Sequence, residues 1–288
     1  QAEDGIRDCL LSRGLGDVYK RQILHSTSYT YDEPVNGLIQ SLKLIPSIHE
    51  GQKIIEWDIK SSIKGIFGSS YKDGAGDIVQ TFSTEEKVKT LDIITKGIVE
   101  TNNQYGILKD YKEEINPDVY LRNTKLTKPN SEIIKLSKMI NPNFEDLLKA
   151  HKLSDLIAEK IEYITGSSTI HQSASDIVKS KKGVCQDFSH LMISCSTYLN
   201  IPARYVTGYL VNSENLSEIE STHAWTEIFM KDLGWVGFDP TNKCCTDDRY
   251  IRLCSGLDSI SASPIRGVTR NPSLENLDYK IEVRREQQ

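Results

Sequence analysis

The chain has 288 residues, of which 38% are hydrophobic, and a formal net charge of −5. This length allows two domains or one large one, and the apolar content is enough for a packed core. No apolar run approaches the length of a membrane span, and the mild negative charge argues against nucleic acid as the main partner. We therefore expect neither a membrane nor a nucleic acid among the partners.

The six cysteines are spread over the chain without regular spacing, at Cys9, Cys185, Cys195, Cys244, Cys245 and Cys254. No C-x-x-C pair occurs, so the sequence predicts no metal centre, and nothing in it indicates a cofactor. The adjacent Cys244 and Cys245 are more typical of reduced thiols in a cytosol than of a disulfide framework. We expect a cytoplasmic protein.

The first 22 residues mix polar and apolar side chains without a long apolar stretch, so they do not form a secretory signal. They resemble translated sequencing-adapter sequence. We expect residues 1–22 to be a leader outside the fold, either non-native or a poorly ordered arm.

From Ile23 to about residue 115 the pattern is mostly β. Five short runs of strand-forming residues are separated by turn signals, at 26–31, 41–45, 53–59, 78–82 and 91–99. Short strands at such spacing predict a small β-rich, sandwich-like domain over residues 23–115.

The periodicity changes after residue 128, where apolar residues recur at helical spacing. Helices are predicted over 131–140 and 144–164, and a longer one begins at Cys185 and ends before Pro202. The strands predicted after it cover 204–210, 223–230 and 235–238. Helices followed by an antiparallel sheet indicate an α+β fold, so we expect a catalytic domain over residues 120–288.

Cys185 lies in the segment GVCQDFSH (183–190), where an apolar helix begins. Free N–H groups and a partial positive charge at a helix N-terminus favour the thiolate, which is the form that attacks a carbonyl. The backbone N–H of Cys185 is also a candidate oxyanion donor. The alternative interpretation is a buried core cysteine, and we adopt it for Cys195 on the apolar face of the same helix.

His223 begins a predicted strand in which His223, Trp225 and Glu227 share one face. A base at this place, opposite a helix N-terminus, is well positioned to take the thiol proton. Asp239 ends the next strand, where its carboxylate can accept from the histidine and stabilise imidazolium. Each residue alone has an ordinary structural interpretation, but their joint occurrence at element ends predicts a Cys185–His223–Asp239 triad.

Three segments, GVCQDFSH (183–190), HAWTE (223–227) and GWVGFDPTN (234–242), resemble in this order the signature of transglutaminase-like cysteine peptidases. The resemblance implies a papain-like catalytic domain in which Cys185 is the nucleophile, His223 the general base and later acid, and Asp239 the orienting residue. Residues 24–35 are similar to the start of the bacterial transglutaminase-like N-terminal region. Segments within 250–267 look like the usual C-terminal portion.

Other residues near these motifs are candidates for supporting roles. Gln186 is expected to line the cleft, Asp187 and Glu227 to support the site from behind, and Trp225 to pack the sheet rather than bind substrate. His190 projects about 140° away from Cys185 around the helix, which disfavours it as the base. The acidic loop 212–221 is either a gate that disfavours acidic substrates or simply an exposed loop.

These observations predict cysteine-dependent attack on an amide carbonyl, with a thioester at Cys185. Water is the default acceptor, because aminolysis requires a site that excludes water and holds an amine. A peptidase or amidase acting on a peptide or another amide-containing substrate is therefore favoured. The first alternative is protein-glutamine γ-glutamyltransferase cross-linking, and the second is a non-catalytic binding module on the same fold.

Overall fold

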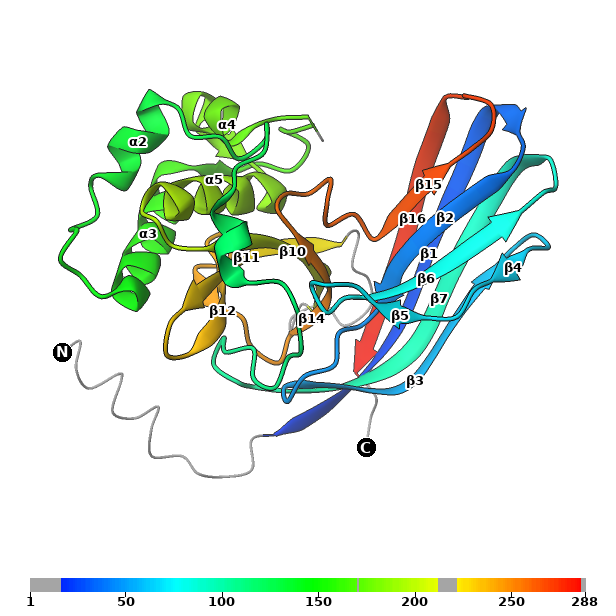
Figure 1. Cartoon of the computed structure of the whole chain (residues 1–288), viewed down its shortest axis with the longest axis horizontal. Coiled ribbons are helices and arrows are strands. Elements are labelled where there is room, and N and C mark those ends of the chain that lie inside the picture. Colours follow the sequence, from blue (N-terminus) through cyan, green and yellow to red (C-terminus); the bar gives the residue numbers. More distant parts are fainter. Residues whose placement is uncertain (1–16, 170, 212–221, 286–288) are drawn as a thin grey trace.

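Two bodies lie side by side in the computed structural model, which describes residues 17–169, 171–211 and 222–285 (Figure 1). One body, at the right of Figure 1, consists of two β-sheets, and the other carries helices on one face of a third sheet. From residue 17 the described chain runs through the β body, crosses to the helical body and returns to the β body with β15 (Ile265–Val268) and β16 (Glu275–Arg285).

Alternation of buried and exposed side chains builds the β body as a sandwich. Its first sheet has the antiparallel strand order β16 (Glu275–Arg285), β1 (Val18–Val35), β7 (Val88–Asn102) and β3 (Gln52–Ser61). Its second sheet has the order β15 (Ile265–Val268), β2 (Leu38–Ile45), β6 (Ile78–Thr84) and β4 (Ile66–Phe67), with β5 (Tyr71–Lys72) also paired to β6. The core between the sheets includes Tyr29, Leu42, Phe82, Leu91 and Ile93. The predicted β-rich N-terminal region is confirmed.

The start of β1 differs from the predicted leader boundary. The strand begins at Val18 instead of after residue 22, because Lys20 and Arg21 pair through their backbone with Glu100 and Val99 of β7. This stretch is mostly polar, so the alternation of apolar residues did not predict a strand there. Residues 1–16 lie outside the described residues.

The strand pairing also disagrees with the predicted boundaries of the catalytic domain, residues 120–288. β15 pairs with β2, and β16 pairs with β1 along eleven positions from Arg21↔Arg285 to Tyr31↔Glu275. The acidic and basic residues that alternate along β16 are typical of an exposed segment, and only its inner positions, such as Ile281 and Val283, are buried. The C-terminal strands therefore complete the sandwich and do not extend the helical body.

The second body is the expected α+β arrangement. Its antiparallel sheet has the order β13 (Cys244–Cys245), β12 (Gly234–Asp239), β11 (His223–Met230), β10 (Ala203–Leu210) and β14 (Tyr250–Gly256). The helices α2 (Ser131–Ser137), α3 (Asp146–Lys160), α4 (Ala174–Ser180) and α5 (Cys185–Tyr198) lie together over one face (Figure 1). The core between helices and sheet includes Ile157, Leu191, Met192, Ile228 and Phe238.

Short elements connect the two bodies and lead into α5. A 3-10 helix, η1 (Pro117–Leu121), follows the sandwich strands. β8 (Glu162–Tyr163) pairs in parallel with β9 (Lys182–Gly183), which places residue 163 next to the entry of α5. Within the described ranges, no helix is both long and apolar enough to cross a bilayer.

An apolar layer joins the sandwich to the sheet of the α+β body. Ile23, Val99 and Ile281 from the first sandwich sheet pack against Tyr209 of β10 and Leu253 of β14. Because these contacts use strands from both ends of the chain, the sheet that carries the candidate site is supported directly by the sandwich.

Candidate active site

The first turn of α5 holds Cys185 at the helix N-terminus. Valine at the N-cap position, residue 184, offers no side-chain acceptor, but the carboxylate of Asp187 accepts from the Val184 N–H at 2.8 Å. Ser168 donates to the other oxygen of Asp187 at 2.9 Å. Glycine is required at position 183, since a Cβ there would lie 2.8 Å from the Cβ of Asp187. Asp187 therefore fixes the turn on which Cys185 lies.

Gln186 follows Cys185 on the first turn and is partly exposed. The carbonyl of Val184 accepts from the N–H groups of Asp187 and Phe188, so the N–H groups of Cys185 and Gln186 come before the first helical donor. They are the backbone donors that a helix start offers to a developing negative charge.

His223 is held at the start of β11 by its neighbours in the sheet. It pairs with Gly208 of β10, where a Cβ would lie 2.5 Å from the ring of Trp225 and 2.1 Å from the carbonyl oxygen of Ile251. The absence of a side chain at position 208 lets the Trp225 ring lie beside the imidazole, with ring centroids 6.4 Å apart and an interplanar angle of 24°. Trp225 is 2% exposed, so it is a wall behind the histidine and not part of an open cleft.

The Asp239 carboxylate is buried at the end of β12 and accepts five hydrogen bonds. Oδ2 receives His223 Nε2 at 2.6 Å, Asn242 Nδ2 at 2.7 Å and Tyr250 Oη at 2.8 Å. Oδ1 receives the backbone N–H groups of Thr241 at 2.9 Å and Asn242 at 3.3 Å. Because a carboxylate only accepts, Nε2 of His223 carries a proton, which leaves Nδ1 for the thiol.

The surroundings raise the pKa of His223 and lower the pKa of Asp239. Burial by itself lowers the pKa of His223, but the hydrogen bonds with Asp239 and with the Cys185 side chain outweigh this effect and raise it. Burial likewise opposes ionisation of Asp239, yet its hydrogen bonds from His223, Asn242 and Tyr250 lower its pKa overall. The arrangement favours imidazolium between a sulfur and a carboxylate, the charge state that a thiolate nucleophile needs.

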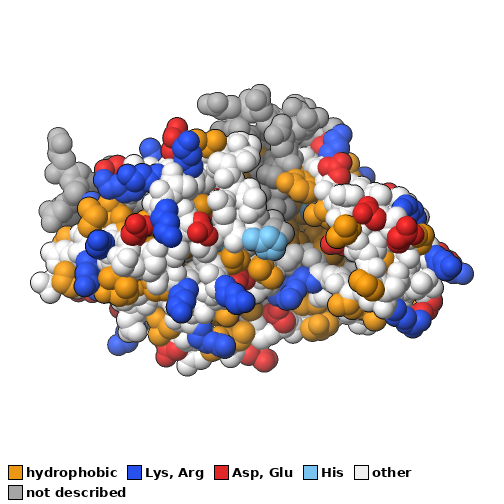
Figure 2. Space-filling model, turned by 90° about the horizontal axis from the view of Figure 1, so that it is seen from above, with side chains coloured by type: hydrophobic (Ala, Val, Ile, Leu, Met, Phe, Trp, Pro, Cys, Tyr) orange, Lys and Arg blue, Asp and Glu red, His pale blue; other side chains and the backbone are white. Residues whose placement is uncertain are grey.

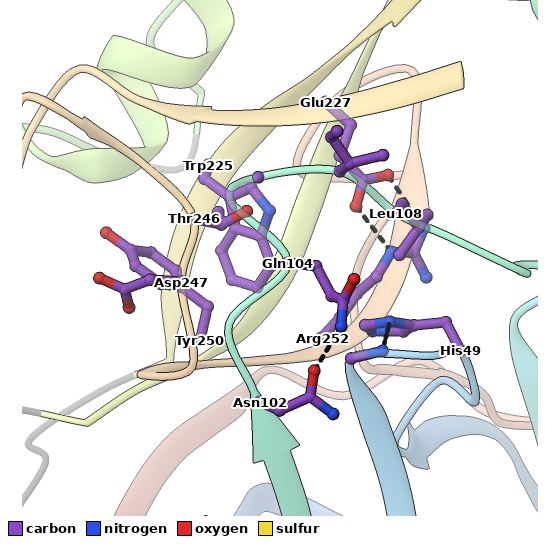
Figure 3. A pocket seen from close by; sticks show the side chains of 13 residues that line it. His49, Asn102, Gln104, Leu108, Trp225, Glu227, Thr246, Asp247, Tyr250 and Arg252 are labelled. Carbon is purple, nitrogen blue, oxygen red and sulfur yellow. Dashed lines mark hydrogen bonds and ion pairs between the residues drawn. The ribbon is translucent and has the colours of Figure 1, made fainter. Parts of the chain in front are cut away.

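Two residues with motif positions lie away from this centre. Glu227 is 3% exposed and forms ion pairs with Arg204 at 2.7 Å and Arg252 at 2.9 Å, behind the sheet. Figure 3 shows Glu227 and Arg252 on one side of a cavity of about 40 Å³, with Trp225 on another. His190 is fully buried, where its Nε2 accepts from the Ser259 N–H at 3.1 Å, so it does not face the thiol.

The structure adds three side chains that the sequence did not single out for the site. Asn242 and Tyr250 donate to Asp239, as described above. Tyr163 of β8 is half exposed, and burial and the nearby Cys185 and Asp239 raise its pKa. The place of Asn242 in the segment 234–242 could have indicated a role beside Asp239. Nothing local in the sequence distinguishes Tyr163 or Tyr250 from other tyrosines. The acidic loop 212–221 lies outside the described residues, as does Cys9.

Among the side chains that the structure describes, no group of three or more histidine, cysteine, aspartate or glutamate residues is arranged to hold a metal ion.

A helix that starts at a cysteine, packed on an antiparallel sheet with histidine and aspartate at strand ends, defines a transglutaminase-like α+β protein. Residues 135–240 match the model of the transglutaminase-like superfamily, and residues 21–100 match the bacterial transglutaminase-like N-terminal region. The chain thus carries a transglutaminase-like core after a bacterial transglutaminase-like N-terminal region, and the resemblance inferred from its motifs is confirmed.

Two mycobacterial proteins of similar length are similar to this chain. The uncharacterized protein ML0607 of Mycobacterium leprae is 25% identical over 286 residues, which cover 93% of this chain and 99% of the relative. The uncharacterized protein Rv2569c of Mycobacterium tuberculosis is 26% identical over 303 residues, 96% of each chain. A crystal structure from Cytophaga hutchinsonii, described as a "Putative Cysteine Protease", superposes with a TM-score of 0.72 at 20% identity, over 94% of this chain and 92% of the other. This likeness confirms the fold.

Proposed function

We propose that Cys185, His223 and Asp239 form a catalytic triad that transfers the acyl group of an amide through a thioester. The observation that carries the proposal is the imidazole of His223, which hydrogen-bonds with the Cys185 side chain and, at 2.6 Å, with the buried carboxylate of Asp239. The start of α5 supports it, because free N–H groups stabilise both a thiolate and an oxyanion.

The reaction begins when the Cys185 thiolate adds to the carbonyl carbon of the amide. The carbonyl oxygen becomes an oxyanion beside the backbone N–H of Cys185. His223 then gives its proton to the leaving nitrogen, the C–N bond breaks, and an amine departs from a thioester. In the second half, neutral His223 takes a proton from water as the oxygen attacks the thioester carbon, and the acid product leaves as the Cys185 sulfur is released.

Hydrolysis is the proposed outcome, with a peptide or another amide-containing molecule as substrate. Water is the default acceptor, because aminolysis requires a site that excludes water and holds the amine. Charged side chains of both signs are interspersed over the face seen in Figure 2, which favours a peptide over nucleic acid as the partner on that face. We further propose a cytoplasmic location, because the five described cysteines are all free thiols.

We predict that iodoacetamide at pH 6 alkylates Cys185 first, by at least about tenfold over every other described cysteine. Burial raises the pKa of the alternatives, to about 12 for Cys195 and about 11 for Cys245, and Cys244 and Cys254 shift in the same direction. The test is time-resolved peptide mapping in a Cys9→Ser background. His223→Ala should slow alkylation of Cys185 and leave the other sites unchanged.

A turnover assay identifies the acyl acceptor. A panel of amide substrates is assayed with and without added primary amines, and Cys185→Ala should abolish product formation in both arms. Release of free acid supports the peptidase or amidase proposal, whereas amine-dependent product without hydrolysis supports cross-linking. Preferential alkylation of Cys244 or Cys245 would show that the nucleophile is wrongly assigned.

A further inference from the structure

Tyr250 contacts the candidate triad from β14, the strand at the opposite edge of the sheet from β13. Its side chain is buried, and its hydroxyl lies 2.8 Å from Oδ2 of Asp239 and 3.3 Å from Sγ of Cys244. The carboxylate can only accept, so the hydroxyl proton points to Asp239, and the oxygen is free to accept from the Cys244 thiol. Tyr250 therefore donates to the same carboxylate oxygen that holds His223.

The ring of Tyr250 is also fixed against the walls of the imidazole. It meets Trp225 edge to face, with centroids 5.4 Å apart at 79°, and it lies 6.0 Å from the His223 ring. Trp225 in turn stacks beside His223. A tyrosine that touches the carboxylate, the imidazole and the tryptophan behind it limits the movement of all three.

We propose that Tyr250 is a positioning residue of the reaction, acting through Asp239. The inference rests on the proposed function. The hydroxyl has two effects: it fixes the rotamer in which Oδ2 faces His223, and it withdraws negative charge from that oxygen. It thereby moderates how strongly Asp239 holds the imidazolium.

The titratable and charged groups around Asp239 and Tyr250 determine in which direction the pKa of His223 moves when the hydroxyl is removed. They come from every neighbouring element: His223 from β11, Cys185 from α5, Tyr163 from β8, Cys244 from β13, and Arg249 and Asp247 from the turn before β14. Removing only the hydroxyl of Tyr250 alters none of these charges. Asp239 then concentrates more charge on its bond with His223, which stabilises imidazolium, so His223 loses its proton at higher pH.

The experiment compares wild type with Tyr250→Phe, measuring kcat/KM and the rate of Cys185 alkylation from pH 5 to 10. We expect kcat/KM to fall about tenfold, in the range of one hydrogen bond to a charged group, and the alkaline limb of its pH profile to move to higher pH. The acid limb of the alkylation profile should move to lower pH, because a more stable imidazolium favours the thiolate. Tyr209→Phe is the matched control. It removes another buried hydroxyl, 2.8 Å from Nδ1 of His25, and should keep the wild-type profile.

A double-mutant cycle separates action through Asp239 from a general structural role. In the Asp239→Asn background, Tyr250→Phe should cause no further loss of kcat/KM. The inference would be overturned if the two substitutions reduced kcat/KM by independent factors, or if Tyr250→Phe lowered Tm and left the pH profile unchanged. Failure of wild type to show selective alkylation of Cys185 would instead reject the proposed function, so the two failures are distinguishable.

Discussion

Asp239→Asn is expected to lower kcat by about 10²–10⁴-fold while the protein remains folded, as loss of the carboxylate does in serine triads. Volume and turn preference barely change, so the backbone of β12 and the turn after it should be kept. What changes is the charge beside His223, whose pKa is held up by the Asp239 carboxylate.

The hydrogen bonds around Asp239 explain why an amide cannot substitute there. All five groups within reach of the carboxylate are arranged as donors, three at Oδ2 and two backbone N–H groups at Oδ1. An asparagine must put its NH₂ group at one of these positions. At Oδ1 it would face two fixed N–H groups, and at Oδ2 it would face His223 and turn the imidazole away from the thiol.

Turnover and Tm measured on the same preparation test this expectation. Asp258→Asn is the matched control, because Asp258 is also buried and also accepts from a backbone N–H, that of Ser261, at 2.8 Å. The control should lower Tm without a comparable loss of rate. A normal rate in the Asp239 variant would remove this carboxylate from the mechanism and leave Cys185 and His223 as a dyad.

The local chemistry of the site was accessible from the sequence, because each residue is placed by short-range structure. Cys185 follows a glycine at a helix start, and His223 and Asp239 lie at strand ends. Periodicity gives helix and strand boundaries to within a few residues, and β11 begins and ends where it was predicted. The three motifs in this order carried the resemblance to the transglutaminase-like superfamily.

Long-range pairing was not accessible in this way. β16 joins β1 across more than two hundred residues, and its charged residues alternate as they would in an exposed strand. Tyr250 begins β14, and its sequence context is typical of a core residue, since its proximity to Asp239 depends on the order of five strands. Glu227 shares a strand face with His223, but whether such a residue meets substrate or cations is decided by the neighbouring strands β10 and β14.

The ion pairs of Glu227 connect the candidate site to the sandwich. Arg204 lies against the ring of Trp235, 3.9 Å from its centroid, and also pairs with Glu113. Arg252 binds Asp77 of the sandwich at 3.1 Å as well as Glu227. Glu227 is thus the anion between two buried guanidinium groups, on the same strand face as His223.

We expect Glu227→Gln to lower the free energy of unfolding by about 3–5 kcal/mol, the range for removing one partner of a buried ion pair. The variant keeps the side-chain volume but leaves two guanidiniums with one fewer counter-charge. Urea unfolding at pH 7 measures the loss. Glu159→Gln is the control, since Glu159 pairs with Lys160 at the exposed surface, and its effect should be small beside that of Glu227→Gln.

Acid unfolding provides a second, independent readout of the same residue. Burial opposes ionisation of Glu227, but Arg252 and Arg204 outweigh it and lower its pKa from 4.5 to about 2. A carboxyl with a depressed pKa contributes stability above its unfolded pKa and loses it as pH falls toward the folded value. Wild type should therefore lose stability between about pH 5 and pH 2 more steeply than Glu227→Gln, which has no proton to bind there. Parallel acid profiles with a loss below about 1 kcal/mol at pH 7 would show that Glu113 and Asp77 compensate both guanidiniums without Glu227.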